Sequence, residues 1–230
     1  MANNSGLNGL YRPRSALARA LYEKQRNDRH LQEFDQNEWY RVDKSRVNEE
    51  LQQKFVQLEP DDETKEFLSN SIDKSSWVWT QIWYLLAKAV LKHFWTTTDI
   101  NGLLDTEEWW REQRFDCVCM LNLLDRCSKP WSMLRQAKTA IAPDGVLLLA
   151  LVLPYKPYVE GTSDHKPEER LPIQGVNFEE QAASFIQFMK DEIGFEAVVW
   201  SRAPYLCEGD FAQAYYWLDD SIYVFTPIRE

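Results

Sequence analysis

Three polar side chains follow directly after an apolar run near the middle of the chain. The run, "FDCVCML", covers residues 115–121 and is followed by Asn122, Asp125 and Arg126. An amide, a carboxylate and a guanidinium together provide hydrogen-bond donors, acceptors and both signs of charge, so they can bind and orient a polar ligand. Residues 129–141 then show the apolar spacing of a helix. The three side chains therefore lie where a predicted strand passes into a predicted helix.

The surrounding sequence predicts an α/β fold built on a parallel sheet. Apolar strands at residues 115–121 and 146–153 alternate with amphipathic helices at residues 129–141 and 178–192. Continuous apolar strands of this kind are typical of a parallel sheet that is covered on both faces. Ligands of such sheets bind beyond the carboxyl ends of the strands, so we expect the side chains that follow the strands to line a site.

The C-terminal part of the chain predicts two more strands, near residues 195–202 and 221–227, which we expect to form an antiparallel pair. The helix before them has recognisable end signals. Asn177 is the predicted N-cap, Glu180 stands three residues later as its capping-box partner, and Gly194 is the predicted stop.

The loops after the later strands carry aromatic and acidic residues. "LPYKPYVE" contains Tyr158, and "APYLCEGD" contains Tyr205, Glu208 and Asp210. Because these loops are expected at the same edge of the sheet as Asn122, we predict that they contribute to one crevice.

A local explanation of the same residues remains open. Asp125 and Arg126 can form an ion pair that caps the following helix, and the tyrosines of the later loops can pack on the rim without binding a ligand. Glu208 and Asp210 can form a solvated turn around Gly209.

The N-terminal half of the chain predicts helices outside the sheet. In "VNEELQQKFVQL", apolar residues recur at helical intervals and predict a surface helix: Val47, Leu51, Phe55 and Leu58. We therefore divide the chain into an N-terminal tail at residues 1–38, a helical extension at residues 39–104 and an α/β domain at residues 105–230.

The most apolar stretch is "WVWTQIWYLLAKAVLKHFW", which predicts an amphipathic helix over residues 79–94. Lys88, Lys92 and His93 interrupt its second half, so we predict a buried or interface-lying helix rather than a firm transmembrane segment. The N-terminus has arginines and no acidic residue before Tyr22, which is compatible with an organelle-targeting segment or a mobile basic tail. The sequence favours an intracellular protein and leaves the cytoplasm, endoplasmic reticulum and mitochondrion open.

Composition argues against two functional classes. The formal net charge of −10 argues against a nucleic-acid binder, because such proteins gain most of their affinity from a basic face. It permits a basic peptide as partner. The four cysteines include no CxxC pair and are predicted to be free thiols. None of the three histidines has a ligand-like spacing with a cysteine, so we predict no metal site.

Five stretches resemble the DREV methyltransferase family: "FLSNSIDKSSW", "DINGLL", "LNLLDRC", "LALVLPYKPYVE" and "PYLCEGDFAQAYYWLDD". They cover most of the sequence from about Trp39 to the C-terminus. The resemblance implies a Rossmann-like, seven-stranded methyltransferase fold that uses S-adenosylmethionine. It also implies methylation of an imidazole nitrogen in a protein or peptide substrate with alternating histidines.

The resemblance implies roles for the residues of the matching motifs. Those implied to act at the reacting imidazole are Asn122, Asp125, Tyr205 and Tyr216. Those implied to contact the cofactor are Asn122 and Leu123. Those implied to bind the substrate are Arg126, Tyr158, Glu208 and Asp210.

Histidine methylation makes modest demands on the protein. A neutral histidine nitrogen is already nucleophilic, so the enzyme mainly has to align it, orient or deprotonate the ring and exclude water. Asn122 or Asp125 can fix the tautomer by accepting a hydrogen bond from the other ring nitrogen. Tyr205 and Tyr216 can stack on the ring or hydrogen-bond to it.

The chain departs from the family pattern at the cofactor. These enzymes carry a glycine-rich loop after a strand, because only glycine lets the backbone approach the methionine part of the cofactor closely. Here Gly102 is followed by "LLDTEEWWREQRFDC", and only residues 105–114 separate "DINGLL" from "FDCVCML". Two βαβ units need roughly 60 residues. We infer that the segment carrying the glycine loop and the ribose-binding carboxylate is absent, which truncates the first strands and leaves the C-terminal half of the fold.

Two main functions follow from these observations. The first is an active histidine methyltransferase, which the downstream motifs favour. The second is a non-catalytic isoform or pseudoenzyme that retains a peptide-binding surface, which the missing glycine loop favours. A third alternative is a structural fragment, because deletion of central strands leaves unpaired sheet edges that promote association.

Overall fold

The structure is a computed structural model that describes residues 15–76, 114–160, 163–210 and 212–228. These residues belong to two compact units. The larger unit takes its described residues from Gln36–Pro60, Phe94–Leu206 and Trp217–Glu230. The smaller unit takes them from Met1–Asp35, Asp61–His93 and Cys207–Tyr216. The predicted helix at residues 79–94 lies outside the described residues.

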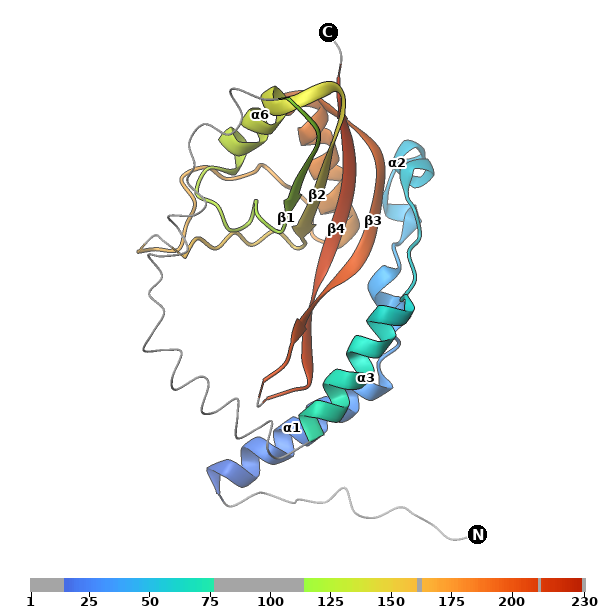
Figure 1. Cartoon of the computed structure of the whole chain (residues 1–230), viewed down its shortest axis with the longest axis vertical. Coiled ribbons are helices and arrows are strands. Elements are labelled where there is room, and N and C mark those ends of the chain that lie inside the picture. Colours follow the sequence, from blue (N-terminus) through green and yellow to red (C-terminus); the bar gives the residue numbers. More distant parts are fainter. Residues whose placement is uncertain (1–14, 77–113, 161–162, 211, 229–230) are drawn as a thin grey trace. The chain divides into compact units, whose positions relative to one another are not determined.

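The described residues form one mixed sheet with the strand order β1-β2-β4-β3 (Figure 1). The strands are β1, Phe115–Leu121; β2, Ile141–Val152; β3, Phe195–Glu208; and β4, Tyr215–Pro227. β1 and β2 are parallel, and β2 and β4 are antiparallel. β3 and β4 are neighbours joined by a connection too short for a parallel crossover, so they form a hairpin. The predicted α/β class, parallel pair and antiparallel pair are confirmed.

Strand β2 begins at Ile141, earlier than the sequence predicts, because its first residues pair irregularly with β1. Phe115 pairs with Ile141, whereas Cys117 already pairs with Val146, so several residues of β2 bulge between the two pairs. Gly145 lies in this bulge, where an added Cβ would stand 2.8 Å from the carbonyl oxygen of Phe115. Only glycine permits this approach of two backbones.

Helix α7, Phe178–Phe188, begins where the sequence predicts, and its α-helical part ends four residues before the predicted end at residue 192. The side-chain oxygen of Asn177 accepts a hydrogen bond from the backbone N–H of Glu180 at 2.9 Å, which caps the helix. At its C-terminus the helix passes into a π-helical turn, Met189–Ile193, and the chain then turns at Gly194 with a left-handed φ of 84°.

Helix α6, Pro130–Ala140, packs beside α7 on one face of the sheet. The ring of Phe185 in α7 lies 5.2 Å from that of Tyr223 in β4, and Trp131 in α6 lies 4.8 Å from Phe188 in α7. The core that these helices cover is apolar and includes the fully buried Leu134, Leu147, Leu149, Phe195 and Phe225. Burial of each such side chain contributes about 1.5–3 kcal/mol.

The segment Gln36–Pro60 lies along β3 of the same unit. It contains 3₁₀ turns at Gln36–Tyr40 and Lys44–Arg46 and a short helix α2, Glu49–Lys54. The predicted surface helix is therefore too long: α2 has Leu51 buried among exposed and half-buried residues, whereas Val47 and Phe55 lie outside the helix and are buried in the core. The helix stops because Phe55 turns into an extended bridge that runs parallel to Trp200 in β3.

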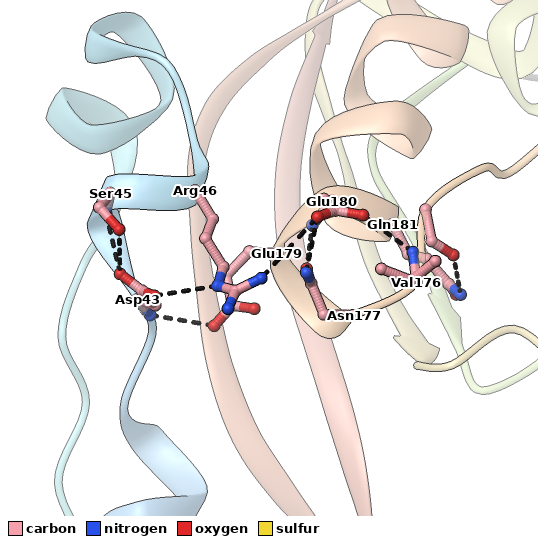
Figure 2. A network of polar contacts seen from close by, with 9 residues as sticks. Asp43, Ser45, Arg46, Val176, Asn177, Glu179, Glu180 and Gln181 are labelled. Carbon is pink, nitrogen blue, oxygen red and sulfur yellow. Dashed lines mark hydrogen bonds and ion pairs between the residues drawn. The ribbon is translucent and has the colours of Figure 1, made fainter.

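Hydrogen bonds also tie this segment to the start of α7 (Figure 2). The backbone N–H of Asp43 donates to Glu179 Oε1 at 2.9 Å, and Arg46 Nε donates to Asp43 Oδ2 at 2.9 Å. Hydrogen bonds from Ser45, then from Arg46, lower the pKa of Asp43. Arg46 Nη1 lies 3.9 Å from Glu180 Oε1.

The smaller unit contains two helices and the end of the β3–β4 hairpin. The helices are α1, Ala16–Glu33, and α3, Asp62–Ser76. Asp28 in α1 accepts a hydrogen bond from the backbone N–H of Ala214 at 2.8 Å, so α1 packs against the hairpin end. Among the described residues, no helix combines the length and apolar character needed to cross a membrane.

Candidate functional site

Asn122 stands at the carboxyl end of β1 in a left-handed backbone conformation with a φ of 52°. Asparagine tolerates this conformation better than most residues. Its backbone N–H donates to the carbonyl oxygen of Ala150 at 3.0 Å and so continues the β1–β2 pairing. Its side-chain Nδ2 donates to Asp220 Oδ2 at 2.8 Å, which fixes the orientation of the amide.

Asp220 is a site residue that the sequence reasoning missed. It lies in β4 opposite Val152, the last residue of β2, and is only 5% exposed. Because β4 is antiparallel to β2, its pairing with β2 begins at Asp220, beside the carboxyl end of β2. The strand pattern of the sequence points to residues that follow strands, whereas β4 runs antiparallel to β2 and reaches the same edge with the residue at which their pairing begins. The available signal was the pair of carboxylates in "LDDSIYVF", within an otherwise apolar strand.

Asp125 is 4% exposed and contacts the loop that follows β2. Its carbonyl oxygen accepts a hydrogen bond from the backbone N–H of Tyr158 at 2.8 Å. Its carboxylate Oδ2 lies 3.4 Å from Arg126 Nε. This ion pair does not cap the next helix, because the N-cap of α6 is Lys129 and has no side-chain capping bond. The local explanation is thus correct for the ion pair and wrong for the cap.

Burial dominates the electrostatics of the two carboxylates. It raises the pKa of Asp125, and the nearby Arg126 opposes that shift. It also raises the pKa of Asp220 to about 6, where the hydrogen bond from Asn122 opposes the shift and the charges of Asp125 and Asp219 add to it. Asp220 therefore changes its charge closer to neutral pH than an ordinary aspartate does.

Three buried oxygens of this cluster accept no hydrogen bond within the described part of the chain: Asn122 Oδ1, Asp125 Oδ1 and Asp220 Oδ1. Most buried polar atoms in native proteins are hydrogen-bonded, so such oxygens call for a donor from a ligand or water. All three are acceptor atoms, so they are suited to a ligand that presents N–H groups.

Aromatic residues of the loop after β2 lie beside this cluster. The guanidinium of Arg126 lies 5.9 Å from the ring centre of Tyr158, within the range of a cation–π contact. Tyr155 is buried, which raises its pKa to about 12, and its backbone N–H donates to Gln181 Oε1 at 2.8 Å. The start of α7, shown in Figure 2, therefore helps to hold this loop in place.

The structure thus brings together four of the residues that the sequence singled out: Asn122, Asp125, Arg126 and Tyr158. Leu123 is half-buried beside them, and its carbonyl oxygen accepts from the N–H groups of Arg126 and Cys127 at 3.0 Å. Tyr205 is exposed on β3, and its side chain has no hydrogen bond or ring contact within the described residues.

Tyr216, Glu208 and Asp210 belong to the smaller unit. There the Tyr216 hydroxyl donates to Asp210 Oδ1 at 2.9 Å, and Glu208 is exposed. Burial and this hydrogen bond raise the pKa of Tyr216 to about 12. The convergence of Tyr205 and Tyr216 with Asn122 and Asp125 stays a prediction.

The described residues do not fit the methionine part of S-adenosylmethionine. β1 is followed by Asn122 and β2 by Leu153, so neither parallel strand leads into a glycine turn. The glycines with positive φ in the described ranges are Gly175 and Gly194, which flank α7 instead. Nor do any three histidine, cysteine or carboxylate side chains of these ranges come together as a metal-binding group.

In a comparison with protein families, the chain matches the model described as DREV methyltransferase. It covers residues 39–110 and 103–227, which is most of the chain and includes every residue of the cluster described above. The two matched segments overlap at residues 103–110. The chain belongs to the DREV methyltransferase family.

Proposed function

We propose that the cluster around Asn122, Asp125 and Asp220 binds the imidazole ring of a histidine in a protein or peptide substrate. The observation that carries the proposal is the presence of three buried acceptor oxygens without a donor. A neutral imidazole presents one N–H donor and one nitrogen with a free lone pair. An acceptor that binds the N–H leaves the other nitrogen free to react.

If S-adenosylmethionine were bound, the family reaction would transfer its methyl group to that second nitrogen, S-adenosylhomocysteine would leave and the ring would release its N–H proton. The cofactor, when bound, supplies the electrophilic methyl group. The residues of this chain orient the ring: the amide of Asn122, held at Nδ2 by Asp220, presents its oxygen to the ring N–H. Asp125 offers a second buried acceptor, and the loop with Tyr158 limits the access of water.

We also propose that residues 105–230 of this chain are the C-terminal half of the seven-stranded family fold. β1 is the edge of the sheet within the described residues, so the strands that precede it in the fold would extend the sheet from that edge. A match in two overlapping segments, 39–110 and 103–227, supports an internal deletion between them. The missing glycine loop favours a peptide-binding isoform or pseudoenzyme over an efficient enzyme.

Isothermal titration calorimetry tests the proposal with a peptide of alternating histidines. A control peptide carries asparagine in place of each histidine, since asparagine keeps the polarity and removes the ring. We expect measurable binding of the histidine peptide only.

Asn122→Ala and Asp125→Ala should each weaken the binding of the histidine peptide about tenfold, in line with the loss of a buried hydrogen bond. Glu192→Ala, at an exposed residue beyond α7, is the matched control and should bind as the wild type does. Equal binding of both peptides would contradict the proposal.

A further inference from the structure

A histidine of the chain itself is stacked on Tyr158. The rings of Tyr158 and His165 are nearly parallel, with centroids 4.5 Å apart and an interplanar angle of 11°. Offset or stacked aromatic pairs at this separation attract each other beyond simple burial. Tyr158 is 42% exposed, so part of its surface remains available to solvent.

Two backbone contacts hold His165 in this position. The N–H of Val159 donates to the carbonyl oxygen of His165 at 3.1 Å, and His165 Nδ1 lies 3.2 Å from the carbonyl oxygen of Val159. A carbonyl oxygen only accepts, so this second bond requires a proton on Nδ1. In the neutral ring Nε2 then carries the free lone pair, as the reacting nitrogen of a substrate histidine would.

The backbone at His165 is in the left-handed region, with a φ of 55°. Residues with a β-carbon adopt this conformation only when their surroundings hold them there. The ring stack and the two contacts with Val159 are the interactions that hold His165.

The stack is directly connected to the candidate site. Tyr158 donates its backbone N–H to the carbonyl oxygen of Asp125, and the guanidinium of Arg126 lies 5.9 Å from its ring centre. The Tyr158 ring, on which His165 stacks, therefore belongs to the loop that borders the buried acceptor oxygens.

We infer that the ring of Tyr158 is a stacking subsite for a histidine imidazole, and that His165 occupies this subsite until a histidine of a bound peptide replaces it. The inference rests on the proposed function for the ligand class. Beyond the proposed function, the inference makes His165 a competitor of the bound peptide. Tyr158 would recognise a histidine by stacking on the face of its ring. Alternate residues of an extended peptide project to the same side, so a peptide with alternating histidines can place one ring at the acceptors and offer another to Tyr158.

Peptide titrations of four variants of the full chain test this inference. His165→Asn removes the ring, and asparagine accepts the left-handed backbone, so the loop should keep its conformation. If His165 covers the subsite about 80% of the time, its removal should tighten peptide binding about fivefold. Tyr158→Leu should weaken binding, and His165→Asn should bring no gain in that background. His30→Asn, in α1 of the smaller unit, is the matched control and should leave affinity unchanged.

Nuclear magnetic resonance follows the displacement directly, because the chain has only three histidines. The ring protons of His165 should be shifted upfield by the stacked Tyr158 and should move to free values when the histidine peptide is added. Binding of equal strength to wild type and His165→Asn, with unmoved His165 signals, would overturn this inference and leave the proposed function standing. Absence of peptide binding in every variant would overturn both.

Discussion

The side chains of Asn122 and Asp220 are joined by a 2.8 Å hydrogen bond although they lie 98 positions apart in the chain. The bond connects the end of β1 to Asp220, where the pairing of β4 with β2 begins, and it uses the amide nitrogen of Asn122. The amide oxygen is thereby left as the group that can meet a ligand. Asp220 thus determines which end of the Asn122 amide is offered.

The raised pKa of Asp220 predicts a pH-dependent stability. The folded protein takes up a proton on this residue near pH 6, whereas the ordinary pKa is 3.8. Between these values the folded state binds more protons, so Asp220 makes stability fall as pH rises, and its effect is constant above both values. Asp220→Asn keeps an acceptor for Asn122 and removes the titration. The free energy of unfolding of Asp220→Asn minus that of wild type should therefore rise by about 2–3 kcal/mol from pH 4 to pH 7.

Urea unfolding at several pH values measures this difference. Asp191→Asn, at an exposed residue after α7, serves as the control and should follow the pH dependence of the wild type. If the difference in free energy of unfolding between Asp220→Asn and wild type is the same at pH 4 and pH 7, the pKa of Asp220 is not raised.

The indole nitrogens of two tryptophans predict different losses of unfolding free energy when each residue is replaced by phenylalanine. Trp200 Nε1 donates to the carbonyl oxygen of Leu51 at 2.8 Å in a buried position. Trp200→Phe leaves that oxygen unpaired and should lower the free energy of unfolding by about 1–3 kcal/mol. Trp131 Nε1 is buried without an acceptor among the described residues, so Trp131→Phe removes an unsatisfied donor and should cost less. Denaturant unfolding compares the two variants, and an equal loss in both would refute the argument.

The contact between Glu179 and Asp43 in Figure 2 predicts a difference between two substitutions of the same residue. Glu179→Ala leaves the half-buried N–H of Asp43 without its acceptor and should cost about 1 kcal/mol. Glu179→Gln retains an acceptor oxygen and should cost less than half as much. Thermal unfolding of the pair gives the comparison. If alanine and glutamine have the same effect, the hydrogen bond contributes nothing to stability.

Neither parallel strand of the described residues leads into a glycine turn, and this predicts weak cofactor binding. Without it the backbone cannot lie against the methionine part of S-adenosylmethionine, and the loss of several contacts of about 1–3 kcal/mol each weakens binding by orders of magnitude. Calorimetry on this chain should give a Kd well above the micromolar range. Insertion of a segment that carries the glycine loop of the family should give binding and turnover, and Asp125→Ala in that longer chain should reduce turnover. Micromolar affinity of the present chain would show that the deletion has been misjudged.

Local signals account for what the sequence predicted correctly. The N-cap Asn177 and the stop at Gly194 act within a few residues of the helix that they delimit, and apolar runs identify β1 and β2 without knowledge of their neighbours. Phe55 was assigned to a helix because its spacing is helical, but its bridge to Trp200 overrides that local preference. Asp220 required knowledge that β4 inserts between β2 and β3, which no local pattern contains.

The pairing of Phe55 with Trp200 also determines when the protein can finish folding during its synthesis. Val56 accepts a hydrogen bond from Ser201, which is made 145 residues later. At typical ribosome speeds this interval lasts roughly 7 to 29 s. Throughout it, the apolar side chains of the segment Gln36–Pro60 have left the ribosome before β3 exists to cover them. The nascent chain therefore presents a defined apolar segment to chaperones for a time that codon usage can lengthen or shorten.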